Sequence, residues 1–111
     1  MFESIDVEKL YSLWLAMKED GEACVIIDVR TPEEYAEVRV PGAKLIALNT
    51  VEVRADEFPK QGKVYLICRS GVRSAQAAGY LAKQYGHTNL VNVSEGTTAW
   101  VNAGYPVERG H

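Results

Sequence analysis

A cysteine followed closely by two arginines is the part of this sequence with the clearest capacity for chemistry. The stretch Ile67–Ser74, ICRSGVRS, places Cys68 directly after an apolar run and brings Arg69 and Arg73 within five residues of it. Guanidinium groups and helix N-termini lower the pKa of a cysteine from about 8.5 to a range of roughly 3.5 to 7.5. A fall of about two units would make the thiolate the main species at neutral pH. A thiolate can attack sulfane sulfur and become a persulfide, which requires no metal or organic cofactor.

The residues that follow Cys68 are suited to hold an anion. The segment Arg69–Arg73 is expected to run from a strand into a helix that begins at Ser74, so its backbone N–H groups can form a concave nest at the positive helix end. Gly71 allows a backbone angle that other residues avoid. Ser74 is expected either to add its N–H group to the nest or to cap the helix. The residues predicted to bind substrate or persulfide are Arg69, Ser70, Gly71, Val72, Arg73 and Ser74.

The alternative for Cys68 is an inert, small side chain at a strand end, since cysteine is among the residues most often buried. Two arginines beside an inert buried thiol would be costly, which favours the reactive interpretation. Cys24 precedes the apolar run Val25–Ile27 and has no activating neighbour in the sequence. We predict that it is a packing cysteine, with a resolving thiol as the alternative.

Strands and helices alternate along the chain. Three short, β-branched apolar runs are typical of strands covered on both faces, namely Val25–Ile27, Val64–Ile67 and Leu90–Val93. The predicted helices are Val7 to about Glu19, a second that starts at Thr31-Pro32, and Ser74–Tyr85. Asp6 provides a helix-start signal, and Gly21 and Gly86 provide helix-end signals. Alternation of this kind predicts an α/β fold with parallel strands, in which ligands bind at the carboxyl edge of the sheet.

Composition limits the remaining possibilities. A length of 111 residues fits one domain over residues 1–111, with a core of about 4–107, and a net charge of −3 provides no basic field for nucleic acid or anionic membrane. The N-terminal segment lacks the basic start and unbroken apolar core of a signal peptide, so we expect a cytoplasmic protein. No C-x-x-C pair or Cys/His cluster indicates zinc. His87 and His111 are predicted to be solvated surface side chains rather than metal ligands.

Several separate motifs, in order and spacing, resemble the rhodanese homology domain from about Ser4 to Val107. They are Asp28–Tyr35 (DVRTPEEY), Val40–Ala43 (VPGA), Cys68–Ser74 (CRSGVRS), Gly96–Trp100 (GTTAW) and Gly104–Val107 (GYPV). The resemblance implies a rhodanese-like three-layer fold, with a central, mostly parallel sheet of about five strands flanked by helices. It also implies transfer of sulfane sulfur from thiosulfate or a persulfide donor to cyanide, a small thiol or a sulfur-acceptor protein.

The resemblance also assigns roles to residues. Cys68 matches the nucleophile and sulfur carrier, and Arg69 and Arg73 are expected to bind the sulfonate of the donor and to help hold the thiolate. Asp28 and Arg30 are expected to form an ion pair that supports the fold. Trp100 is predicted to lie in the core, while Thr97 and Thr98 belong to a segment that lies beside the active-site mouth in relatives.

Two alternatives to sulfur transfer follow from the same resemblance. Phosphatases and arsenate reductases of the family have five residues between cysteine and arginine, whereas Cys68 and Arg73 have four between them, which favours a persulfide over a tetrahedral oxyanion. The other alternative is a non-catalytic or regulatory module that binds a protein partner. Retention of Cys68 and both arginines favours the enzyme.

The chain departs from the family pattern in two places. Val38-Arg39-Val40 replaces the usual Gly-His-Ile, and Glu95-Gly96 replaces a glycine pair. We expect an ordinary backbone angle at Val38. We also expect Glu95 to place an acid near the pocket mouth, where it would disfavour anionic donors such as thiosulfate.

Overall fold

Five parallel strands form the centre of the protein in a computed structural model that describes residues 2–110. They are β1 (Glu3–Ile5), β2 (Val25–Asp28), β3 (Lys44–Leu45), β4 (Val64–Ile67) and β5 (Leu90–Val93), in the order β1-β5-β4-β2-β3. Every neighbouring pair is parallel. The predicted α/β fold is therefore confirmed, and β1 and β3 are the short edge strands that the apolar runs did not reveal.

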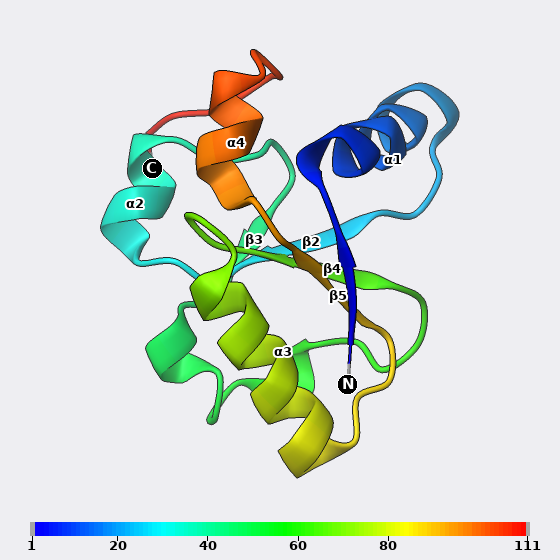
Figure 1. Cartoon of the computed structure of the whole chain (residues 1–111), viewed down its shortest axis with the longest axis vertical. Coiled ribbons are helices and arrows are strands. Elements are labelled where there is room, and N and C mark those ends of the chain that lie inside the picture. Colours follow the sequence, from blue (N-terminus) through cyan, green and yellow to red (C-terminus); the bar gives the residue numbers. More distant parts are fainter. Residues whose placement is uncertain (1, 111) are drawn as a thin grey trace.

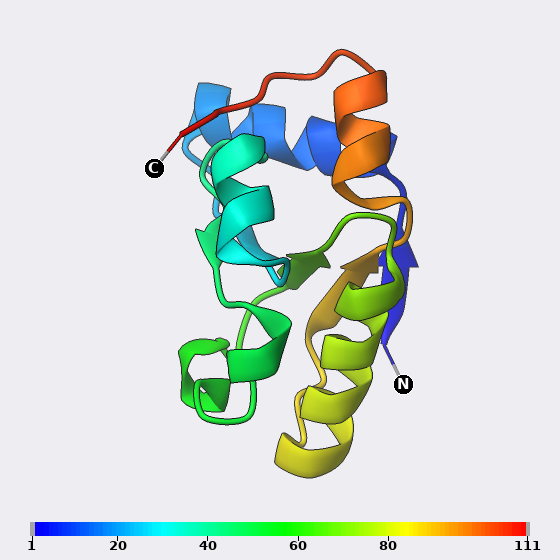
Figure 2. The same ribbon diagram turned by 90° about the vertical axis from the view of Figure 1, so that its left-hand side faces the viewer.

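Four α-helices cover the two faces of this sheet. They are α1 (Val7–Asp20), α2 (Pro32–Glu37), α3 (Val72–Tyr85) and α4 (Gly96–Asn102). Figures 1 and 2 show α1, α2 and α4 on one side of the sheet and α3 on the other, so the fold has three layers. Two short 3-10 turns, Leu48–Thr50 and Ala55–Glu57, lie between β3 and β4. No described helix is long and apolar enough to cross a membrane.

Local signals mark several of the helix boundaries that the sequence predicted, although α4 was not among the predicted helices. Asp6 accepts a hydrogen bond from the N–H group of Lys9 at 2.8 Å, which caps α1. Thr31 and Glu34 form a reciprocal capping box at α2. Gly86 ends α3 in the left-handed conformation, with a φ of 71°. One boundary differs, because α3 begins at Val72 rather than at the predicted Ser74.

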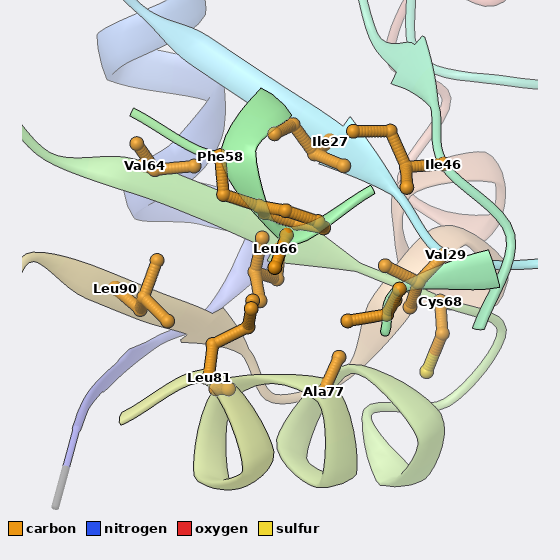
Figure 3. Close-up of a cluster of buried hydrophobic side chains, with 13 residues drawn as sticks. Ile27, Val29, Ile46, Phe58, Val64, Leu66, Cys68, Ala77, Leu81 and Leu90 are labelled. Carbon is orange, nitrogen blue, oxygen red and sulfur yellow. The ribbon is translucent and has the colours of Figure 1, made fainter. Parts of the chain in front are cut away.

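Side chains along each strand alternate between two buried clusters, as the pleat requires. Leu66 and Cys68 belong to the cluster beneath α3, whereas Ile67 and Trp100 belong to the cluster beneath α1 and α4. Figure 3 shows Cys68 beside Val29, near the first turn of α3. Trp100 is completely buried, which confirms the prediction that it lies in the core.

The strand order determines where a site can form. The chain leaves β2 towards β3 on one side and leaves β4 towards β5 on the other, although β2 and β4 are neighbours. The carboxyl ends of β2 and β4 therefore flank a topological switch point, where open parallel sheets bind ligands. Cys68 follows β4 at this point, and Arg30 follows β2.

The prediction of a surface position is wrong for His87, which is 3% exposed. The left-handed turn at Gly86 directs the chain back towards the sheet. The two ring nitrogens then lie 3.3 and 3.2 Å from the carbonyl oxygens of Leu81 and Phe58, which supply polar partners inside the fold. His111, the other histidine, lies outside the described residues.

Candidate active site

The loop after β4 curls around the sulfur of Cys68. The N–H group of Gly71 points at Cys68 Sγ at 3.1 Å. Cys68 is only 1% exposed. Gly71 is the residue that precedes α3, with a φ of 99° in the left-handed region. Val72 and Arg73 thus form the first turn of the helix rather than part of a loop. The helix N-terminus consequently lies against the sulfur.

Close backbone contacts explain two glycines at this site. A Cβ atom on Gly71 would lie 2.1 Å from the carbonyl oxygen of Ser94, and one on Gly96 would lie 2.4 Å from that of Arg69. Both glycines also have positive φ angles, 99° and 69°. No side chain fits at either position, so the cysteine loop can rest directly on the segment between β5 and α4. Glycine is thus retained at Gly96, the second position of the family's glycine pair.

Ser74 lies inside the first turn of α3 and is fully buried. Its hydroxyl oxygen is 3.3 Å from Cys68 Sγ and 2.5 Å from the side-chain oxygen of Asn92. The alternative role of Ser74 as a helix cap is therefore wrong, because Gly71 occupies the cap position and places Ser74 three residues further along. The side chain instead faces the sulfur.

Hydrogen bonding lowers the pKa of Cys68. Burial, the largest influence, raises the pKa of the thiol by disfavouring its charged form, but several hydrogen bonds oppose this effect. They come from the Ser74 hydroxyl and from the N–H groups of Ser74, Ser70 and Gly71, and together they bring the pKa below its ordinary value. The groups that lower the pKa of Cys68 are thus uncharged hydrogen-bond donors of the loop and the first turn of α3. From the sequence, the arginines were expected to contribute to the lowering as well.

The two arginines of the loop occupy different environments. Arg73 forms a two-point ion pair with Glu34 of α2, at 2.7 and 2.8 Å, and this pair holds the pKa of Glu34 at about 2. Arg69 is exposed, and its guanidinium has no ion-pair or hydrogen-bond partner among residues 2–110. The positive charge of Arg69 therefore stays unbalanced by the described residues, while the charge of Arg73 is balanced by Glu34.

Asp28 and Arg30 form a buried ion pair after β2. Arg30 Nη2 lies 2.7 Å from Asp28 Oδ2, and the two side chains are 4% and 0% exposed. Arg30 also donates a hydrogen bond to the carbonyl oxygen of Val38 at 2.7 Å. The pair thus ties the end of β2 to the end of α2. Val38 has an extended backbone, φ −165°, which confirms the prediction of an ordinary angle there.

A cavity of about 190 Å³ lies between α2 and α4, beside the cysteine loop. Its lining consists of Arg30, Glu34, Glu37, Val38, Arg69, Thr97, Thr98, Val101 and Asn102. Thr97 and Thr98 bind the loop through their N–H groups, which donate to the carbonyl oxygens of Cys68 and Arg69. Glu95 is exposed and is not among the lining residues, so the acids at this cavity are Glu34 and Glu37.

Cys24 lies at the opposite edge of the sheet. Val25 pairs with Val64, so Cys24 precedes the sheet while Cys68 follows it. A rise of about 3.3 Å per residue separates the two levels by roughly 16 Å, far more than the ~7 Å that a disulfide tolerates between Cα atoms. Burial raises the pKa of Cys24. A resolving role for Cys24 towards Cys68 is thereby excluded.

Two residues of the site, Glu34 and Asn92, were missed in the sequence. Glu34 was recognised in the sequence only as part of the motif Asp28–Tyr35, and its position beside Arg73 depends on how α2 packs. Asn92 had a detectable signal, because it is the single polar residue in the apolar strand β5. A polar group buried between apolar neighbours must find hydrogen-bond partners. Among residues 2–110 no group of three His, Cys, Asp or Glu side chains could hold a metal ion.

Comparisons with known proteins agree with this geometry. A family model described as Rhodanese-like domain matches residues 12–103. A protein from Allochromatium vinosum named Sulfurtransferase is 38% identical over 107 residues, which cover 96% of this chain and 95% of that protein. Putative sulfur carrier protein YrkF from Bacillus subtilis is 40% identical over 82 residues, 74% of this chain and 44% of that protein. The crystal structure of a rhodanese-like domain protein from Staphylococcus aureus superposes with a TM-score of 0.81 at 32% identity, covering 99% of this chain and 100% of that one.

Proposed function

The chain belongs to the family of rhodanese-like domains, and from this premise we propose that it carries sulfane sulfur as a persulfide of Cys68. The similarity to a sulfurtransferase supports sulfur transfer in general. Thiosulfate or a persulfide is the proposed donor, and cyanide, a small thiol or a sulfur-acceptor protein is the proposed acceptor. The observation that carries the proposal is the ring of hydrogen-bond donors around Cys68 Sγ, with Gly71 N at 3.1 Å and Ser74 Oγ at 3.3 Å.

The first half of the reaction loads a sulfur atom onto Cys68. The Cys68 thiolate attacks the outer sulfur of thiosulfate, a bond forms between the two sulfurs, and the S–S bond of thiosulfate breaks so that sulfite leaves with its electron pair. The product is Cys68–S–S⁻. The N–H groups of Ser70, Gly71 and Ser74, which hydrogen-bond to the thiolate, are proposed to hold the negative outer sulfur as well, which is the same kind of electrostatic support that an oxyanion hole provides.

The second half of the reaction transfers the outer sulfur from Cys68 to an acceptor. An acceptor nucleophile, a thiolate or cyanide, attacks the outer sulfur, and Cys68 leaves as a thiolate. A lowered pKa makes Cys68 a better leaving group, because the hydrogen bonds stabilise the charge that it regains. No external oxidant or reductant is required, since the sulfane sulfur keeps its oxidation level as it passes from the donor to Cys68 and then to the acceptor. The cycle therefore needs no redox cofactor.

The arginines support sulfur over phosphoryl chemistry. Arg73 is bound at both ends of its guanidinium by Glu34, so it is not available to clamp the oxygens of a phosphate. Arg69 remains as the cation proposed to attract an anionic donor. Because the ion pair Asp28–Arg30 is buried, we assign it to support of the site rather than to contact with substrate.

A protein acceptor is part of the proposal. The relative named putative sulfur carrier protein suggests that such domains exchange sulfur with carrier proteins, although this chain spans less than half of that relative. The proposed location is the cytoplasm, where a reducing environment keeps Cys24 and Cys68 as free thiols.

The intact mass of the protein after incubation with thiosulfate tests the proposal. We expect the gain of one sulfur atom, removed by dithiothreitol or cyanide, in the wild type and in Cys24→Ser but not in Cys68→Ser. A small persulfide donor provides a second arm. No gain from either donor would refute the proposal and favour a module that binds a partner without catalysis.

A further inference from the structure

Asn92 of β5 hydrogen-bonds to the start of α3, where the cysteine loop ends. It is 5% exposed and lies two residues after Leu90 on β5, so it faces α3 on the same side of the sheet as Cys68. Its Nδ2 group donates to the carbonyl oxygen of Gly71 at 3.3 Å, and its Oδ1 atom accepts from the Ser74 hydroxyl at 2.5 Å. The carbonyl of Gly71 can only accept, which fixes the orientation of the amide.

The hydroxyl of Ser74 has two acceptors and one proton. Asn92 Oδ1 lies 2.5 Å from Ser74 Oγ, and Cys68 Sγ lies 3.3 Å from it. A hydroxyl donates one hydrogen bond and accepts up to two, so it cannot donate to both partners at once. When Cys68 is a thiol, its S–H group can donate to Ser74 Oγ while Ser74 donates to Asn92. When Cys68 is a thiolate, it can only accept.

We propose that Asn92 is a positioning residue that competes with Cys68 for the Ser74 proton and thereby tunes the nucleophile. Ser74 donates to Asn92 while Cys68 is a thiol or a persulfide, and it turns to Sγ when Cys68 is a thiolate. The inference rests on the proposed function, because that function requires Cys68 to cycle between these forms. In the persulfide the charge resides on the outer sulfur, so Sγ no longer needs the proton.

In this proposal Asn92 makes the Cys68 thiolate less stable than the Ser74 hydroxyl alone would make it. Each time Ser74 turns to Sγ, the buried Oδ1 atom of Asn92 loses its donor, and an unpaired buried acceptor is unfavourable. Asn92 therefore favours forms in which Sγ is uncharged. This bias promotes attack on a donor. Once the persulfide has formed, Sγ is uncharged, and the Ser74 hydroxyl can again donate its hydrogen bond to Asn92.

Other charges near Cys68 are not altered by a change at Asn92. They are Arg69 of the loop, Arg73 of α3, Glu34 of α2, the pair Asp28 and Arg30 after β2, and Glu95 before α4. A change in the reactivity of Cys68 on substitution of Asn92 thus reports on Ser74 or on the loop carbonyl, and a double substitution separates the two.

Alkylation of Cys68 by iodoacetamide between pH 5 and 9, in a Cys24→Ser background, provides the test. At pH 6 we expect Asn92→Val to accelerate alkylation by about tenfold and Ser74→Ala to slow it by about tenfold, the effect of one hydrogen bond to a charged sulfur. The double variant is expected to match Ser74→Ala, because Asn92 acts through Ser74. Asn89→Val is the matched control, since the Asn89 amide likewise holds two partners, the carbonyl groups of Pro59 and Gly62, and does not contact Ser74 or Cys68; we expect it to leave the alkylation rate unchanged.

Equal acceleration by Asn92→Val with and without the Ser74 hydroxyl would overturn the inference, as would no change or slower reaction in the single variant. Failure of the proposed function has a different signature. In that event wild-type Cys68 itself would react only near pH 8.5, as an ordinary thiol does.

A measurement on the wild-type protein covers the possibility that Asn92→Val does not fold. The side-chain ¹³Cγ resonance of Asn92 is expected to shift with the same midpoint as the alkylation profile, because its carbonyl loses a donor when the thiolate forms. The resonance of Asn89 is expected to stay constant. An Asn92 resonance that does not respond to ionisation of Cys68 would overturn the inference.

Discussion

Replacement of Gly71 by alanine tests whether the shape of the loop sets the reactivity of Cys68. Gly71 has a φ of 99°, and an added Cβ would meet the carbonyl oxygen of Ser94 at 2.1 Å. Gly86 offers a matched control, because its φ is 71° and a Cβ there would meet nothing within 4 Å. Both substitutions impose the left-handed strain, and only Gly71→Ala adds a collision at the site.

The two costs can be separated. Left-handed strain costs about 1–2 kcal/mol, so we expect Gly86→Ala to lower the free energy of unfolding by that amount. In Gly71→Ala the backbone must also move by at least about 1.3 Å, from the 2.1 Å approach to the 3.4 Å at which ordinary van der Waals contact begins, which breaks the 3.1 Å hydrogen bond from Gly71 N to Cys68 Sγ. A hydrogen bond to a charged group is worth about 1.5–3 kcal/mol, so the thiolate population at a pH below its pKa falls roughly 10- to 150-fold.

Two assays measure these effects. Thermal or urea unfolding gives the free energies, and the rate of iodoacetamide alkylation of Cys68 at pH 6, in a Cys24→Ser background, gives the thiolate population. We expect alkylation of Gly86→Ala at the wild-type rate and of Gly71→Ala at least about tenfold more slowly. If folded Gly71→Ala reacted as fast as Gly86→Ala, the hydrogen bond from the loop would not be what lowers the pKa of Cys68.

Three further substitutions test the charged groups. Arg69→Ala is expected to raise the KM for thiosulfate several-fold without changing the pH profile of Cys68 alkylation, and an unchanged KM would remove Arg69 from donor binding. Asp28→Asn leaves the buried Arg30 cation without its partner, so urea unfolding is expected to show a loss of about 3–5 kcal/mol; a loss below about 1 kcal/mol would contradict this. Glu34→Gln weakens the partly exposed pair with Arg73 and is expected to lower the free energy of unfolding by about 1 kcal/mol above pH 5. Because the folded-state pKa of Glu34, about 2, lies below its unfolded value, this stabilisation is lost as the pH falls from about 4.5 towards 2, so wild type and variant should converge there. A difference that is independent of pH would show that the ion pair is not its source.

Local physical chemistry was sufficient to predict much of the fold. Asp6 and the pair Thr31-Pro32 begin helices because side-chain oxygens satisfy the free N–H groups of a first turn, which depends only on neighbours in sequence. The three long apolar strands were recognisable for the same kind of reason. The edge strands β1 and β3 were not, because two or three residues carry too little hydrophobic pattern to distinguish them from a loop.

The candidate nucleophile was also evident in the sequence, because Cys68 stands between a strand and a helix, and parallel strands present such junctions at one edge. The groups that surround Cys68 were less evident in the sequence. The sequence placed Arg73 beside the donor, whereas α2 brings Glu34 to it and balances its charge. Asn92 and Ser74 are eighteen residues apart and meet only because β5 lies beneath α3.

The sequence by itself therefore determined the fold class, several helix ends and the identity of the candidate nucleophile, since each depends on residue types within one or two turns of chain. The tertiary structure decided which groups touch the sulfur and which charges remain free. His87 shows the same division, because packing rather than composition placed its imidazole between two carbonyl groups. The physical reason is that hydrogen bonds and ion pairs act over about 3 Å, and only the packing of α2, α3 and β5 brings residues far apart in sequence within that distance.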